Sequence, residues 1–144
     1  MPLDTAAARR SILFLLLAEI GAMSLWFVSA AILPEMRAET PMSPGRAAAL
    51  SSAVQIGFVL GALGFALHGT ADRFDPRRVF AASALVGALT NAALLVTPVG
   101  GVAQVVLRAV TGAALAGVYP VGMKIVVGWS VERRGLLIGL LVSA

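Results

Sequence analysis

The sequence predicts an all-α integral membrane protein with four transmembrane helices and the start of a fifth. The first observation is composition: 59% of the 144 residues are apolar and only 12% are charged, with a mean hydropathy of +0.93. Soluble domains average about 45–50% apolar and about 25% charged residues. The second observation is that the charged residues gather in short gaps between apolar runs of membrane-spanning length, about 20 residues. This composition excludes a soluble enzyme, and we expect no enzymatic activity.

The first apolar run covers residues 11–33 and contains one charge, Glu19. It is longer than the core of a signal peptide, which has about 7–15 residues, so we interpret it as a transmembrane helix. A proline-rich loop follows. The second helix is expected over 47–69, after Ser43 and Pro44, which form a favourable N-cap and first-turn pair.

The second predicted helix presents a stripe of small residues. Gly57, Gly61 and Gly64 recur at helical spacing, so they share one face. Small residues on one face let another helix approach closely in lipid, because no side chain separates the two backbones. We expect these glycines to be helix-packing positions.

The third and fourth helices are expected over 79–96 and 102–127 and are joined by a tight turn. The fourth carries Arg108 and Lys124, and Pro120 between them is a point where the helix can kink. One face of this helix holds Arg108, Gly112, Leu115, Tyr119 and Gly122. We expect Gly112 to be a further packing position.

The charges of the loops predict the topology. The basic residues on the side of the N-terminus are Arg9, Arg10, Arg73, Arg77, Arg78, Arg133 and Arg134. The loops on the opposite side contain only Arg37 and Arg46. Because basic loops stay in the cytoplasm, we expect a multi-pass protein of the inner (plasma) membrane with a cytoplasmic N-terminus.

Several classes of site have no basis in this sequence. The net charge of +4 does not indicate a nucleic-acid partner, because the basic residues form no patch of their own. The chain has no cysteine and one histidine, which removes thiolate and histidine-cluster metal sites. We therefore expect no catalytic residue, no metal site and no cofactor.

The loop between the second and third predicted helices reads HGTADRFDPRR from His68 to Arg78. It resembles the signature G-x-L-A-D-R-x-G-R-K of the major facilitator superfamily, a family of secondary transporters. The matching positions are Asp72, Arg73, Arg77 and Arg78. The sequence departs from the signature at His68, Asp75 and Pro76. The resemblance implies that the matching residues form a latch that favours one conformational state.

Other segments resemble the same family in the same order along the chain. They are Leu25-Trp26-Phe27 with Leu33-Pro34, Arg108 followed by the small residues 111–117, and the segment Trp129–Gly135. The resemblance implies a bundle of twelve helices in two six-helix halves. On this view the chain is the N-terminal portion of a transporter and the missing C-terminal helices are its partners. The fifth apolar run, 136–144, would be the start of the next helix.

Glu19 is a candidate for a proton or cation site. It lies about 12 Å along the first helix, at about 1.5 Å per residue. A carboxylate at such depth is unfavourable by about 2.5–3.5 kcal/mol on insertion scales. In the family, the first and fourth helices line the central cavity. A structural hydrogen bond to a neighbouring helix is the alternative.

Four further residues are candidates for the substrate or proton pathway. Arg108 could pair with a carboxylate or an anionic substrate, or could be capped by backbone carbonyls while it snorkels outward. Lys124 could act in the pathway or could simply snorkel. Trp26 and Tyr119 could contact a lipophilic or aromatic substrate or could serve only in packing.

The function expected from these observations is transport of a small solute by alternating access, driven by protons, in an antiporter or a symporter. The expected partners are the solute, the proton and the lipid bilayer. Two alternatives are a complete four-helix oligomer similar to small multidrug exporters, and a membrane scaffold subunit that transports nothing. The intramembrane charges argue against a scaffold, because they are unfavourable without a role.

Overall fold

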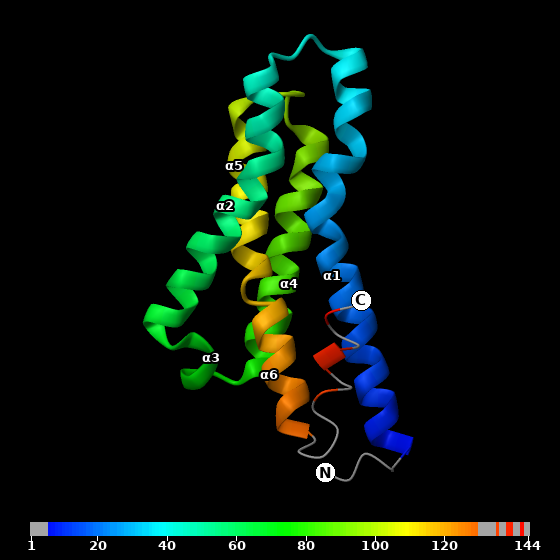
Figure 1. The fold of residues 1–144 in the computed structure, drawn as a ribbon, viewed down its shortest axis with the longest axis vertical. Helices are drawn as coiled ribbons and strands as arrows, with labels where there is room; N and C mark the ends of the chain where they lie inside the picture. Colours follow the sequence, from blue (N-terminus) through cyan, green and yellow to red (C-terminus); the bar gives the residue numbers. More distant parts are fainter. Residues whose placement is uncertain (1–5, 130–134, 136–137, 140–141, 143–144) are drawn as a thin grey trace.

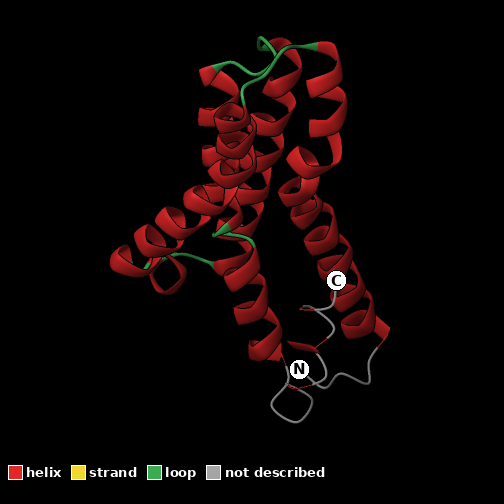
Figure 2. Cartoon of the chain, turned by 45° about the horizontal axis from the view of Figure 1, so that its top comes forward, coloured by secondary structure: helices red, strands yellow, loops and turns green. Residues whose placement is uncertain are grey.

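The computed structural model describes residues 6–129 together with Gly135, Ile138, Gly139 and Val142. The predicted fifth run and the basic pair at 133 and 134 lie largely outside these residues. The described part contains helices and no strand (Figure 2). Four helical stretches are long and apolar enough to cross a membrane: 10–39, 44–68, 76–96 and 102–128. The predicted all-α membrane fold is confirmed.

Helix α1 (Ala6–Glu39) runs past the end predicted at residue 33. Pro34 lies inside it and has no N–H for the carbonyl one turn earlier, but a proline removes only that one bond. The residues that follow Pro34 favour a helix, and the last turn closes through the Thr40 amide, which donates to Met36 O at 3.0 Å. The proline-rich loop is therefore shorter than expected.

Helix α2 (Pro44–His68) begins and ends at clear local signals. The Ser43 hydroxyl accepts a hydrogen bond from the Arg46 amide at 3.2 Å, which confirms the predicted N-cap. The helix starts at Pro44, before the predicted 47, because proline fits the first turn. It ends at Gly69, whose φ of 58° is left-handed and favours glycine.

The charged loop contains a short helix, α3 (Thr70–Arg73), before helix α4 (Pro76–Ala92) and its 3-10 continuation η1 (Ala93–Val96). Asp75 caps α4, because its carboxylate accepts from the Arg77 amide at 2.9 Å. The third span thus begins at residue 76 and not at 79, since the cap and the proline after it start the helix one turn earlier.

The fourth span consists of two helices, α5 (Val102–Leu115) and α6 (Tyr119–Trp129), which differs from the single helix predicted over 102–127. Pro120 cannot donate to the carbonyl of Ala116. Just before it the backbone tightens into turns, with Gly117 N to Ala114 O at 2.9 Å and Val118 N to Leu115 O at 3.0 Å. Pro120 therefore ends one helix and starts another within one span.

The four spans alternate in direction, and α2 packs most extensively on α5 (Figure 1). A Cβ on Gly57 would overlap the Ala109 carbonyl, and one on Gly112 would overlap the Val54 carbonyl. Gly61 lies similarly close to Ala113, whereas a Cβ on Gly64 would meet no atom within 4 Å. The buried core between the helices consists of Ala22, Val54, Val79, Phe80, Leu115, Val118, Val121 and Ile125.

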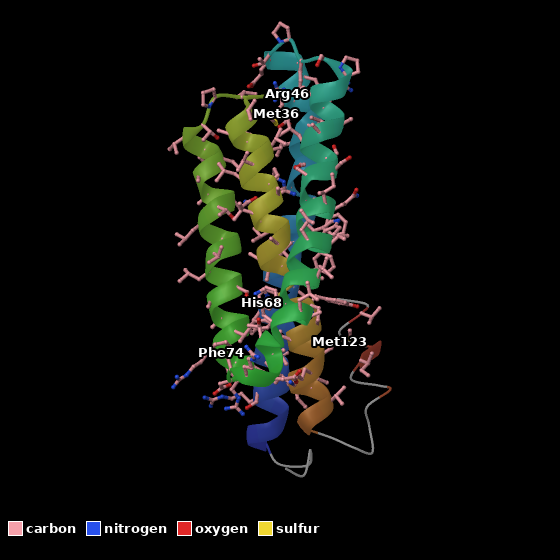
Figure 3. All side chains as sticks on the ribbon, turned by 90° about the vertical axis from the view of Figure 1, so that its left-hand side faces the viewer. Met36, Arg46, His68, Phe74 and Met123 are labelled. Carbon is pink, nitrogen blue, oxygen red and sulfur yellow. The ribbon has the colours of Figure 1, made fainter. Side chains whose placement is uncertain are left out.

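Helix α1 covers this core from one side and leaves most of its own apolar surface exposed. Figure 3 shows Met36 and Arg46 at one end of the bundle, while His68, Phe74 and Met123 lie toward the other. The charged loop is thus at the end opposite the α1–α2 connection.

The α2–α5 contact predicts different effects for two substitutions on one helix. Gly57→Ala places a methyl group against backbone, and such overpacking typically destabilises by about 1–3 kcal/mol. Gly64→Ala meets open space and improves helix propensity. Thermal unfolding in detergent should show a lower midpoint for Gly57→Ala and no loss for Gly64→Ala. Equal midpoints for the two variants would contradict the close approach of the two backbones.

Candidate functional site

Arg108 of α5 is the centre of a buried polar cluster. Its Nη1 donates to the Leu25 carbonyl at 2.9 Å and to Asn91 Oδ1 at 3.2 Å, and its Nη2 donates to the Trp26 carbonyl at 2.9 Å. The side chain is 1% exposed. Arg108 therefore joins α5 to α1 and α4. It is capped by backbone carbonyls, as one sequence-based alternative held, but it points into the bundle and does not snorkel outward.

The positive charge of Arg108 has no carboxylate partner among the described residues, where the one ion pair joins Asp72 and Lys124. Its Nε is buried and finds no hydrogen-bond acceptor in the part of the chain that the structure describes. The guanidinium is stabilised by neutral dipoles: three of its five N–H groups have acceptors in the described residues, and the N–H of Nε is one of the two that do not.

A polar seam between α4 and α5 continues from this cluster. The hydroxyls of Thr90 and Thr111 lie 2.8 Å apart, and Thr111 also donates to the Leu107 carbonyl at 2.9 Å. Asn91 is the next residue along α4 and reaches Arg108. The sequence shows these polar residues but not their pairing, because pairing depends on how the two helices are rotated relative to each other.

Glu19 of α1 lies in a different, apolar environment. It is 1% exposed, and within the described part of the chain neither carboxylate oxygen has a hydrogen-bond partner. The carboxyl group lies against Gly122 of α6, where a Cβ would collide with it, and the same point is 3.4 Å from the Phe80 ring of α4. Glycine at this position therefore makes the space that the carboxyl group fills.

The structure does not bring Glu19 and Arg108 together. The carbonyls that Arg108 binds come six and seven residues after Glu19, about 9–10.5 Å farther along α1 at about 1.5 Å per residue. No hydrogen bond or ion pair links the two side chains in the described residues. These two ionisable side chains of the membrane-spanning helices therefore lie in separate environments.

The two aromatic candidates are half-buried. The Trp26 ring packs edge-on against Phe58 of α2, with ring centroids 5.3 Å apart and an interplanar angle of 78°. Its backbone carbonyl also accepts from Arg108, a role that no sequence pattern reveals. Tyr119 is the first residue of α6, directly after the break in the fourth span.

Lys124 of α6 reaches the charged loop. Its Nζ donates to the Ala71 carbonyl at 2.6 Å and pairs with the Asp72 carboxylate at 2.5 Å. This hydrogen bond and the lysine charge lower the pKa of Asp72 below its usual range. Both side chains are exposed to solvent, Lys124 at 42% and Asp72 at 81%. The other latch candidates are also exposed: Arg73 ends α3, and Arg77 and Arg78 lie in the first turn of α4.

Comparison with known proteins identifies one family. A family model described as Major Facilitator Superfamily matches residues 15–144, a stretch that includes Glu19, the charged loop and Arg108. No curated protein and no solved structure gave a match. Proteins of this family are membrane transporters, and the family is generally non-enzymatic. The match covers nearly the whole chain, and the four membrane-spanning stretches agree with it. The chain belongs to the major facilitator superfamily and is a multi-pass membrane protein of the transporter class.

Proposed function

We propose that this protein moves a small solute across the inner (plasma) membrane by alternating access, and that binding and release of a proton by Glu19 drive the cycle. The observation that carries the proposal is the buried Glu19 carboxyl group without a hydrogen-bond partner in the described residues. The family match is the reason why we propose a major facilitator transporter and not a four-helix oligomeric exporter or a scaffold.

The proton step follows from the surroundings of Glu19. An ionised carboxylate is very unfavourable in an apolar site without partners, whereas a neutral carboxylic acid is much less so. The packing of α1 against Gly122 and Phe80 therefore suits the protonated form. Loss of the proton favours a state in which α1 moves away and water reaches the carboxylate. Protonation and helix packing are coupled because each conformation stabilises one charge state.

Arg108 has a different part in the proposed cycle. Its bonds to α1 and to Asn91 of α4 hold together the half of the bundle that is nearer the α1–α2 connection. Helix α1 would then pivot about this cluster, and the part of α1 that packs against α6 would move the most. The partner surface would come from the missing C-terminal helices of the same transporter, against which this bundle would rock.

The proposed orientation has the N-terminus in the cytoplasm. Support comes from the exposed arginines Arg73, Arg77 and Arg78, which follow α2. Figure 3 shows His68 and Phe74, on either side of α3, at the opposite end of the bundle from Arg46. In this orientation Lys124 holds the cytoplasmic loop onto α6 through Ala71 and Asp72. We infer that the latch implied by the family resemblance starts from this contact within the bundle.

The absence of cysteine from the sequence permits a direct test of the proton step. Leu15 packs on Val126, between α1 and α6, so Leu15→Cys reports whether these helices are in contact. We expect maleimide labelling in nanodiscs, normalised to labelling of the same protein in detergent-denatured form, to rise several-fold from acidic to alkaline pH. Glu19→Gln should abolish this rise, because it keeps the shape but cannot ionise.

Glu35→Gln is the matched control, since Glu35 is exposed on the same helix. It should leave the pH dependence of labelling unchanged. A pH-dependent rise that persists in Glu19→Gln would show that another group controls the packing of α1.

The loop contact generates a second prediction. Lys124→Gln removes the ion pair with Asp72, and faster amide hydrogen exchange is expected over residues 70–73 at neutral pH. Lys124→Arg should retain most of the protection. Because both groups are exposed, the change should be modest. Since the pKa of Asp72 is lowered, the wild-type contact should persist at neutral pH and be lost only as the pH falls through that lowered value. Identical amide exchange over residues 70–73 in Lys124→Gln and Lys124→Arg would rule out the contact.

A further inference from the structure

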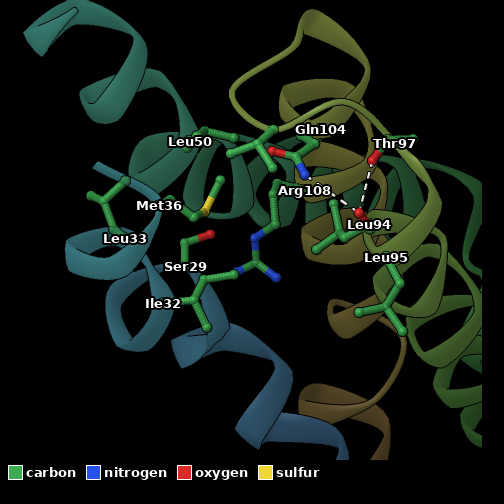
Figure 4. Close-up of a pocket in the computed structure, with 11 residues that line it drawn as sticks. Ser29, Ile32, Leu33, Met36, Leu50, Leu94, Leu95, Thr97, Gln104 and Arg108 are labelled. Carbon is green, nitrogen blue, oxygen red and sulfur yellow. Dashed lines mark hydrogen bonds between the residues drawn. The ribbon is translucent and has the colours of Figure 1, made fainter. Parts of the chain in front are cut away.

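A cavity of about 260 Å³ lies at the end of the bundle near the α1–α2 connection (Figure 4). It is lined by α1, the start of α2, the η1 turn and the start of α5, its surface is mostly aliphatic, and it is open on the side where Ile32 and Leu95 are exposed. Arg108 and Ser29 supply polar groups to its wall. In Figure 4 the Ser29 hydroxyl points toward the guanidinium across the cavity.

The other polar residues of the wall are already occupied by the η1 turn. Gln104 accepts from the Gly100 amide at 2.9 Å and donates to the Leu94 carbonyl at 3.4 Å. Thr97 donates to the same carbonyl at 3.0 Å. Arg108 Nε, in contrast, has no hydrogen-bond partner in the described residues, and no hydrogen bond within them engages the hydroxyl of Ser29, a residue that is 6% exposed.

These features define the chemistry of a ligand. The guanidinium repels cations, and a neutral apolar molecule would leave the Nε donor unsatisfied. A dianion would bring a second charge against an aliphatic wall. A single carboxylate can accept from Arg108 and Ser29 while its apolar body fills the rest of the cavity. The volume is below the roughly 300–1,000 Å³ of drug-sized ligand sites, so a small body is enough to fill the cavity.

We propose that this cavity binds a small monocarboxylate with a short aliphatic or aromatic body, at a site separate from Glu19. The anion would complete the hydrogen bonding of Arg108 and neutralise its charge. Binding at this site does not depend on proton coupling. A failure of this proposal would therefore leave the proposed transport cycle untouched, and the reverse also holds.

The test is equilibrium dialysis of radiolabelled hexanoate against the full chain in nanodiscs of neutral lipid, with empty nanodiscs subtracted. We expect saturable binding with one site per chain. Hexanol and hexylammonium have similar bodies without the negative charge, and each should compete at least about tenfold more weakly than unlabelled hexanoate. Hexanol as effective as hexanoate would overturn the proposal.

Two tryptophan substitutions on α1 locate the binding. Ile32→Trp fills the cavity from a position that is 38% exposed, and it should weaken hexanoate binding about tenfold or more. Ile20→Trp adds the same bulk at a position that is 44% exposed and outside the cavity wall, and it should leave binding unchanged. Ser29→Ala should weaken binding without disturbing the helix contacts of Arg108. Binding that is insensitive to Ile32→Trp would place the ligand elsewhere and refute this site.

An anion with an apolar body could also come from the membrane, as the headgroup and chain of a lipid. Nanodiscs with added phosphatidylglycerol separate the two sources. Unchanged hexanoate affinity supports a soluble ligand, whereas displacement by the anionic lipid contradicts it and identifies a lipid site.

Discussion

The position of α1 depends on the hydrogen bonds from Arg108 to two consecutive carbonyls, those of Leu25 and Trp26. Helix α1 buries little of its apolar surface against the other helices, so packing alone constrains it weakly. Two adjacent carbonyl acceptors determine both its rotation and its height relative to α5. Glu19 precedes Trp26 by about two turns and lies on the same face. The bonds of Arg108 therefore direct Glu19 into the bundle.

The separation of the two buried charged groups has a chemical consequence. In an apolar interior a direct ion pair between Glu19 and Arg108 would hold both side chains in their charged forms. The structure instead gives Arg108 neutral oxygen acceptors and leaves Glu19 against Gly122 and Phe80. A carboxyl group without a fixed counter-ion can gain or lose a proton without first breaking an ion pair. The small residue at Gly122 matters here, because any side chain would displace the carboxyl group.

Sequence reasoning succeeded where the signal was local or compositional. It predicted the all-α membrane fold and the Ser43 cap, both of which the structure confirms. It also predicted the family, which the family model confirms. It could not predict the partners of Arg108, because these depend on the rotation of three helices. It also placed the end of the first helix at residue 33, because Pro34 is usually a breaker, whereas the helix formers after Pro34 extend α1. The stripe of glycines in α2 has one member, Gly64, without a close neighbour, because α5 does not run along the full length of α2.

The central claim is that Glu19 carries the exchangeable proton. Infrared difference spectroscopy of the full chain in nanodiscs tests it most directly, because a protonated carboxyl group has a carbonyl stretch distinct from that of a carboxylate. A protonated-carboxyl band should be present in the wild-type protein, disappear as the pH is raised, and be missing from Glu19→Gln. If the band is absent at every pH, or is unchanged in Glu19→Gln, Glu19 is not the proton site and the proposed coupling is wrong.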